Sequence, residues 1–228
     1  MRKPGDFRVE NLNDPEGLGY VSPRGAPFTS AMLLIFWLVF LLDQLGRHGA
    51  PLGPFMTLGA IVPSLVLDGQ WYRLVTYGFL HFNILHILGN SIALFMAGAL
   101  VEYVYGSARY AVIYVIGLVG GGIAAFMWTI GTNDVTAGAS GAIAGVFGAM
   151  AVLGVKLPPL RRELLQAALV PILIVIGLGF LATGISNAGH IGGLICGAVA
   201  AAMLRPARGD DLLRQLRLGQ DINNPRQM

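Results

Sequence analysis

The chain has 228 residues, of which 55% are hydrophobic and only 12% are charged, and its net charge is +3 at pH 7. The charged share is about half that of an ordinary soluble domain, so the composition excludes a water-soluble globular protein of this size. It predicts an all-α, polytopic membrane protein built as a bundle of transmembrane helices.

Six apolar segments of near-spanning length predict six transmembrane helices. We expect them at residues 28–45, 84–101, 110–130, 138–155, 167–181 and 188–204. A single membrane domain, residues 28–204, contains all six. A polar cytoplasmic segment at 1–27 precedes this domain, and a cytoplasmic tail at 205–228 follows it.

The positions of the cations predict the orientation in the membrane. If the N-terminus is cytoplasmic, only Arg47 and Arg73 of the fifteen Lys and Arg residues fall on the outer side. Cations accumulate on the cytoplasmic side, so we expect both termini there. They surround helix ends and form no single basic face, which argues against nucleic-acid binding. The polar, acidic N-terminal segment is unlike a signal or transit peptide, which favours a bacterial-type plasma (inner) membrane.

The longest connection, residues 46–76, joins the first two predicted helices and contains three prolines among apolar residues. Prolines make a straight helix costly, and a seventh span would move the C-terminal arginines outside. We therefore expect an irregular or short-helical loop, with Trp71 and Tyr72 as interfacial anchors. This membrane-associated loop would lie at the outer interface or dip into it.

Small residues recur at every fourth position in the third, fourth and last predicted helices, as at Gly193 and Gly197. Such stripes let helix backbones approach closely in lipid, and packing alone explains most of these glycines. Close contact of the fourth and sixth helices would also bring Ser140 near His190.

Few polar side chains interrupt the predicted spans, and each is a functional candidate because it is costly within a bilayer. They are His81, His86, Asn90, Ser91, Ser140 and His190. The second, fourth and sixth helices all begin on the outer side. At about 1.5 Å per residue, their polar residues lie within ~10 Å of the outer helix ends. Three helices therefore place polar residues in one layer.

Ser140 stands between glycines at the expected start of the fourth helix, in Gly138-Ala139-Ser140-Gly141. A serine hydroxyl becomes nucleophilic when a base lies beside it. Gly138 and Gly141 allow a tight backbone and close approach of a substrate strand, and unpaired N–H groups at a helix start stabilise an oxyanion. For an isolated G-x-S-G motif, a small serine between packed helices is the commoner explanation.

His190 is the candidate base, and no nearby carboxylate is available to orient it, so the prediction is a Ser-His dyad. The alternative is a histidine that only bonds to a neighbouring helix.

His86 and Asn90, spaced i,i+4, share one helix face from which their N–H groups would complete an oxyanion hole. His81 and His86, spaced i,i+5, are poorly placed as joint metal ligands. We expect no metal and no other cofactor.

With these residues the chain resembles the rhomboid family of intramembrane serine proteases over about residues 68–204. The matching pieces, in order, are Gln70-Trp71-Tyr72-Arg73-Leu74-Val75-Thr76, Phe79-Leu80-His81, His86-Ile87-Leu88-Gly89-Asn90, Glu102, Gly106, Gly138-Ala139-Ser140-Gly141-Ala142, and His190-Ile191-Gly192-Gly193 with Gly197. Each motif alone is weak evidence for the family, but their order and spacing together are specific to it.

The resemblance implies that Ser140 is the nucleophile and His190 the general base, with oxyanion support from His86, Asn90 and the backbone around Ser140. It implies structural or supporting roles for His81, Arg73, Glu102, Gly193 and Gly197. The implied reaction is hydrolysis of peptide bonds in or near transmembrane segments of single-span or multi-span membrane proteins. Water would enter from the outer side, and a substrate helix would arrive laterally past the fifth helix.

Two positions depart from the family's pattern. Its Trp-Arg pair appears as Tyr72-Arg73, and Ala144 stands where some members carry an aromatic side chain against the catalytic histidine.

One alternative function is a catalytically silent rhomboid-like protein that binds transmembrane clients, which would not need the four polar site residues. A transporter or channel would spread ionisable groups through the membrane depth, whereas here they gather at one level.

Overall fold

The computed structural model describes residues 25–181 and 186–214 of the chain. Its long helices are α1 (Pro27–Leu45), α5 (Ile84–Tyr105), α6 (Ser107–Thr129), α7 (Ser140–Lys156), α8 (Arg161–Leu181) and α9 (Asn187–Met203). The shorter elements are α2 (Pro54–Gly59), α3 (Pro63–Leu67), α4 (Arg73–Thr76), η2 (Tyr77–Phe79) and η3 (Pro158–Leu160). The predicted all-α class is confirmed, and each long helix overlaps one of the predicted segments.

Three helices, α1, α5 and α6, are long and apolar enough to cross a membrane. α7 and the segment 158–177 meet the same requirement only together, with a bend of 119° between them. α7 and α9 have 17 residues each, or about 26 Å, which is shorter than the ~30 Å hydrocarbon core. By length and composition the described residues thus contain three or four candidate spans, and the predicted count of six is not confirmed. Most of segment 1–27 and part of tail 205–228 lie outside the described residues.

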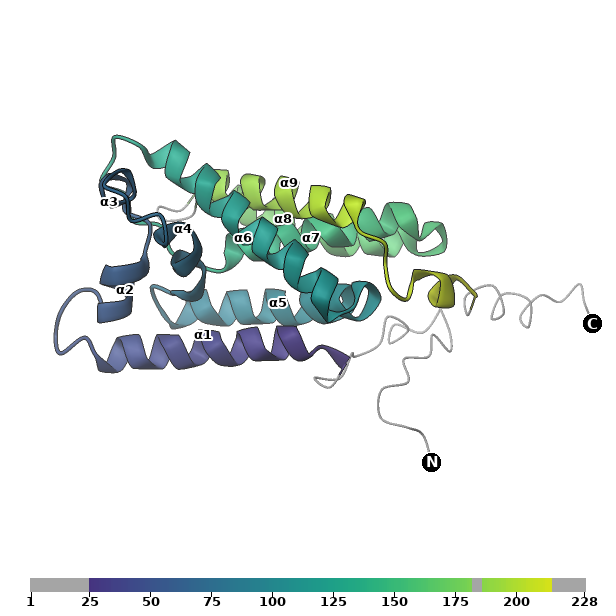
Figure 1. Ribbon diagram of the computed structural model, residues 1–228, viewed down its shortest axis with the longest axis horizontal. Helices are drawn as coiled ribbons and strands as arrows, with labels where there is room; N and C mark the ends of the chain where they lie inside the picture. The colour runs from purple at the N-terminus through teal and green to yellow at the C-terminus, as the bar shows by residue number, and fades with distance from the viewer. Residues whose placement is uncertain (1–24, 182–185, 215–228) are drawn as a thin grey trace, which may run out of the picture.

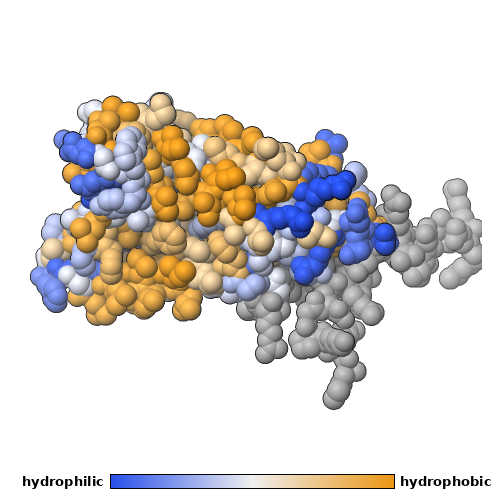
Figure 2. All heavy atoms as spheres, in the orientation of Figure 1, coloured by the Kyte–Doolittle hydropathy of each residue, from blue (hydrophilic) through white to orange (hydrophobic). Residues whose placement is uncertain are grey.

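The long helices lie roughly side by side, and the short helices α2, α3 and α4 gather at one end of the bundle (Figure 1). α9 packs closely on α6 and α7, while α1 lies against α5. Figure 2 shows apolar side chains over the middle of the visible face and hydrophilic ones towards both ends. Leu38, Met96 and Phe180 are among the large apolar side chains that are exposed. Such a distribution is typical of a protein that sits in a bilayer.

Glycines set the distance between α7 and α9. A Cβ on Gly197 would overlap the backbone of Gly145, and one on Gly193 would overlap the carbonyl oxygen of Gly141. The backbones therefore touch directly, as small residues permit between helices in lipid. The predicted close packing of these two helices is confirmed, and it brings their first turns together.

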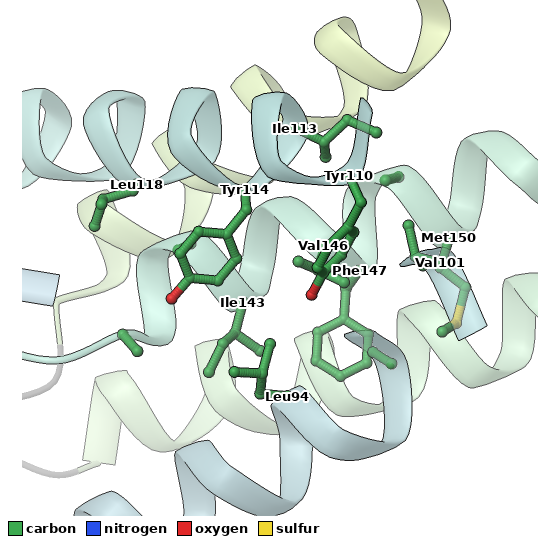
Figure 3. Packing of buried hydrophobic residues seen from close by; sticks show 14 of the residues in the cluster. Leu94, Val101, Tyr110, Ile113, Tyr114, Leu118, Ile143, Val146, Phe147 and Met150 are labelled. Atoms are coloured by element: carbon green, nitrogen blue, oxygen red, sulfur yellow. The ribbon is translucent and has the colours of Figure 1, made fainter. Parts of the chain in front are cut away.

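Aromatic side chains from α6 fill the space beside this contact. Figure 3 shows Tyr110 and Tyr114 pointing from α6 towards Leu94 and Ile143, within one buried apolar cluster. The ring of Phe28, at the start of α1, meets both tyrosine rings edge-on with centroids 5.5 Å apart. This arrangement attaches α1 to the core of the bundle.

Glu102 joins three helices at the end of the bundle away from the short helices. Its buried carboxylate accepts hydrogen bonds from the backbone N–H of Phe28 and Thr29, each at 2.8 Å, and from the Ser107 hydroxyl at 2.6 Å. It thereby satisfies N–H groups that the first turn of α1 leaves unpaired. Glu102 is positioned to stabilise the fold, far along α5 from the polar residues of its first turns.

Side chains hold the connection between α1 and α5 in place. The buried guanidinium of Arg73 donates to the carbonyl of Ala60 at 2.6 Å and to Gln70 Oε1 at 2.8 Å. Asp43 Oδ1, near the end of α1, accepts from the N–H of Met56 at 2.9 Å. The connection is thus a set of short helices tied to α1 and to each other.

We predict that Gly197→Ala destabilises the protein by about 1–3 kcal/mol or more, because its Cβ must push α9 away from α7. Gly177→Ala is the matched control, since its Cβ would meet no described atom within 4 Å. Helix propensity predicts a gain of up to ~1 kcal/mol for that control. Thermal unfolding in detergent measures both, and equal melting temperatures would contradict the packing argument.

We predict that Glu102→Ala costs about 3 kcal/mol, because it leaves two backbone N–H groups at the start of α1 without their acceptor. Ser107→Ala removes only one of the three hydrogen bonds to this carboxylate and should cost about 1 kcal/mol. Thermal unfolding of the two variants is the test. A Glu102→Ala protein as stable as Ser107→Ala would show that the hydrogen bonds between Glu102 and the start of α1 contribute little to the stability of the protein.

Candidate active site

Ser140 is the first residue of α7, and the turn before it is strained in a way that suits glycine. Gly138 has φ of +135°, a conformation that L side chains rarely adopt. Ala139 occupies the N-cap position and offers no side-chain hydrogen bond to the helix. The first N–H groups of α7 therefore remain available beside the serine, where an anion would be stabilised.

The structure brings Ser140 and His190 into contact. His190 Nε2 lies 2.8 Å from Ser140 Oγ, although the two residues are 50 positions apart in the chain. This distance is that of a good hydrogen bond, so the imidazole can accept the hydroxyl proton. Hydroxyl and imidazole thus lie in the contact that the predicted nucleophile–base pair requires.

His190 is held by the first turn of α9. Ser186 caps this helix: its hydroxyl accepts from the N–H of Gly189 at 3.1 Å, and its carbonyl accepts from the N–H of His190 at 3.0 Å. The imidazole is 5% exposed, and its Nδ1 has no hydrogen-bond partner among the described residues. No carboxylate of the described chain orients the ring, as in a dyad.

His86 and Asn90 face the turn before Ser140 from the first two turns of α5. A Cβ placed on Gly138 would lie 2.7 Å from Nε2 of His86 and 3.8 Å from Nδ2 of Asn90. Asn90 is 7% exposed, and its amide nitrogen has no hydrogen-bond partner among the described residues. A buried donor without a partner is costly, and a substrate oxygen at this point would satisfy it.

A cavity of about 670 Å³ joins these groups. Ser140, His190, His86 and Asn90 all line it, together with residues 135–138 of the turn before α7. Its walls become apolar away from the serine, and α8 contributes Pro171, Ile172, Val175 and Ile176. The cavity is therefore polar beside Ser140 and apolar along α8.

The connection between α1 and α5 holds the turn that carries the nucleophile. Ile61 and Thr136 exchange two backbone hydrogen bonds, of 2.9 and 3.0 Å, as an isolated antiparallel bridge. The carbonyl of Tyr77 accepts from the N–H of Gly138 at 3.0 Å, and its hydroxyl donates to the carbonyl of Leu118 at 2.9 Å. The sequence reading did not single out Tyr77, because a lone buried tyrosine is indistinguishable from a core residue in a sequence.

The remaining residues of interest surround the site or lie apart from it. The ring of His81 is buried and in contact with the ring of His86, with centroids 5.2 Å apart. Gly193 and Gly197 lie at the α7–α9 contact, whereas Arg73 and Glu102 act on the connection and on α1 as described above. Among the described residues, no group of three or more His, Cys, Asp or Glu side chains is arranged to hold a metal ion.

The chain matches one family model and is similar in sequence to several proteins of the same family. The model of the Rhomboid domain matches residues 68–207. The chain is 36% identical over 186 residues to the rhomboid protease GluP of Bacillus subtilis (strain 168), covering 81% of this chain and 36% of that protein. It is 32% identical over 167 residues to the rhomboid protease AarA of Providencia stuartii, covering 62% of this chain and 58% of that protein.

A plant protein also aligns over most of the chain. RHOMBOID-like protein 5 of Arabidopsis thaliana is 31% identical over 185 residues, which are 74% of this chain and 60% of that protein. The chain therefore spans between 36% and 60% of the length of these relatives.

We predict that Gly138→Ala strongly reduces the reaction of Ser140 with a fluorophosphonate probe, because a Cβ there would overlap the ring of His86. Gly131→Ala is a matched control: Gly131 also has a positive φ, of +84°, but its Cβ would meet no described atom within 4 Å. Both variants place a side chain on backbone with a positive φ, at a cost of about 1–3 kcal/mol each. Equal labelling rates for the two would contradict the role of Gly138.

Proposed function

Because this chain belongs to the rhomboid family, we propose that it is an intramembrane serine endopeptidase with Ser140 as nucleophile and His190 as general base. The observation that carries the proposal is the 2.8 Å contact between Ser140 Oγ and His190 Nε2 inside a cavity. A catalytically silent protein that binds transmembrane clients has no use for a hydroxyl paired with a base. Relatives that are named as rhomboid proteases support the same activity.

The chemistry follows from this pair. His190 Nε2 takes the hydroxyl proton as Ser140 Oγ attacks the carbonyl carbon of the scissile peptide bond. The tetrahedral intermediate collapses as His190 returns the proton to the leaving amine, which breaks the C–N bond and leaves an ester on Ser140. A water molecule, deprotonated by His190, then attacks this ester. As the second tetrahedral intermediate collapses, the bond from the acyl carbon to Ser140 Oγ breaks and His190 returns the proton to Oγ, which releases the carboxylic acid product and restores the serine.

Donors on the other side of the nucleophile stabilise the negative oxygen of each tetrahedral intermediate. The imidazole of His86 and the unpaired amide of Asn90 face Gly138, two residues before the nucleophile, and the first turn of α7 has no side-chain cap. Such donors are already oriented before the charge develops, so they stabilise the transition state more than the substrate.

In the membrane, we propose that the six long helices all cross or enter the bilayer within one domain, residues 28–204, with both termini cytoplasmic in a plasma (inner) membrane. The turn before Ser140 and the short helices α2–α4 then lie at the outer end of the bundle, where water enters. α5 and α8 both line the cavity, and α8 packs mainly on α7. A transmembrane segment of a single-span or multi-span substrate would enter between α5 and α8.

A catalytically silent protein that binds transmembrane clients is the competing function, and cleavage separates the two. Purified full-length protein is incubated with a set of single-span membrane proteins in liposomes, in parallel with Ser140→Ala. Cleavage by the wild type alone supports the proposal. If no substrate is cut and no fluorophosphonate labels Ser140 in folded protein, the chain is not a protease of this kind.

Graded losses are expected from the other site residues. His190→Ala should abolish cleavage with little change in the melting temperature, because the imidazole bonds only to Ser140 among the described residues. Asn90→Ala removes one oxyanion donor and should lower kcat by ~10²–10³. Initial rates on one cleaved substrate provide the measurement, and appreciable turnover by His190→Ala would mean that another group is the base.

A further inference from the structure

His81 is a buried polar side chain that the proposed mechanism does not use. Its ring is 2% exposed, and neither Nδ1 nor Nε2 has a hydrogen-bond partner among the described residues. Burying two unpaired polar atoms costs free energy that an apolar ring of similar shape would avoid. Phenylalanines stand close by at positions 79 and 82, so apolar rings are readily accommodated here.

Four rings form a row from α1 to the cavity. The ring of Phe36, on α1, lies 5.2 Å from that of His81, which lies 5.2 Å from that of His86 at an interplanar angle of 72°. His86 also stacks against Phe82, with centroids 6.0 Å apart and an angle of 13°. His86 therefore contacts both an apolar ring and the imidazole of His81.

The orientation of His86 decides what it can donate. The ring edge formed by Cε1 and Nε2 faces Gly138, two residues before the nucleophile. A neutral imidazole carries its proton on one nitrogen only, and its surroundings select which one. To stabilise an oxyanion beside Ser140, His86 must keep the proton on Nε2 and leave Nδ1 as an acceptor.

His81 remains neutral in this position. Burial, and to a smaller degree the neighbouring His86, lowers the pKa of His81 to about 3, against a smaller opposing effect of the Phe79 backbone. A neutral imidazole has one N–H donor and one acceptor, and His86 is the polar ring in contact with it. The two imidazoles are in direct contact, with centroids 5.2 Å apart, although no hydrogen bond joins them in this structure.

We propose that His81 is a positioning residue, whose imidazole holds the ring of His86 in the orientation and tautomer that present Nε2–H to the carbonyl under attack. The proposal rests on the proposed hydrolytic function only for its effect on catalysis. The contact itself is a property of the folded protein. A role as a metal ligand is disfavoured, because no third His, Cys, Asp or Glu of the described residues joins the two histidines.

The variant that separates ring shape from ring chemistry is His81→Phe, which keeps an aromatic ring and removes both nitrogens. The chain has four histidines, so spectra of ¹⁵N-histidine-labelled full-length protein can be assigned by single substitutions. We expect the ring nitrogens of His86 to shift towards a mixture of tautomers in His81→Phe, while those of His48 stay unchanged. Unchanged His86 signals in folded His81→Phe protein would overturn the proposal, whether or not the protein has activity.

Kinetics give a second test once a substrate is cleaved by the wild type. His81→Phe should lower kcat about tenfold, a part of the full loss of one oxyanion donor, and change KM less than twofold. The tenfold loss of kcat that His81→Phe causes should vanish in a His86→Ala background and persist in an Asn90→Ala background. An equal loss in both backgrounds would show a general structural effect and overturn the proposal. Phe40→Leu, at a buried position of α1 that is not one of the four rings, controls for lost stability and should keep the wild-type kcat.

Discussion

The direct backbone contact between α7 and α9 is the constraint on which the site depends. Gly145 and Gly197 touch at this crossing, so the two helices cannot shift apart without losing it. Ser140 and His190 stand in the first turns of these helices, and neither side chain is long. The 2.8 Å hydrogen bond between them therefore requires the glycine contact. Between helices in lipid, such small-residue packing replaces the hydrophobic effect as the source of attraction.

The position of the turn before Ser140 depends on the irregular connection between α1 and α5. Arg73 ties the short helices together, Ile61 pairs with Thr136, and Tyr77 holds the N–H of Gly138. These bonds position the turn before Ser140 against His86 and Asn90 of α5. Polar donors that lack partners are costly in an apolar bundle, and they are retained at the place where a transition state would bind them.

Much of this arrangement can be predicted from the sequence. Apolar runs located all six long helices to within a few residues, apart from the start of α8, because burial in lipid or in the core demands continuous apolar surface. The high cost of polar groups inside such runs identified Ser140, His190, His86 and Asn90 as candidates. The four-residue glycine spacing also predicted which helices touch.

Tertiary structure decided the rest. The bend of 119° after α7, the role of Tyr77 and the row of rings around His86 leave no local pattern, because each depends on groups far apart in the chain. Tyr77 bonds to Leu118, 41 residues away, and Phe36 meets His81 from another helix. Hydropathy and spacing report on one segment at a time. The hydrogen bonds and ring contacts that orient a side chain exist only after the segments have packed.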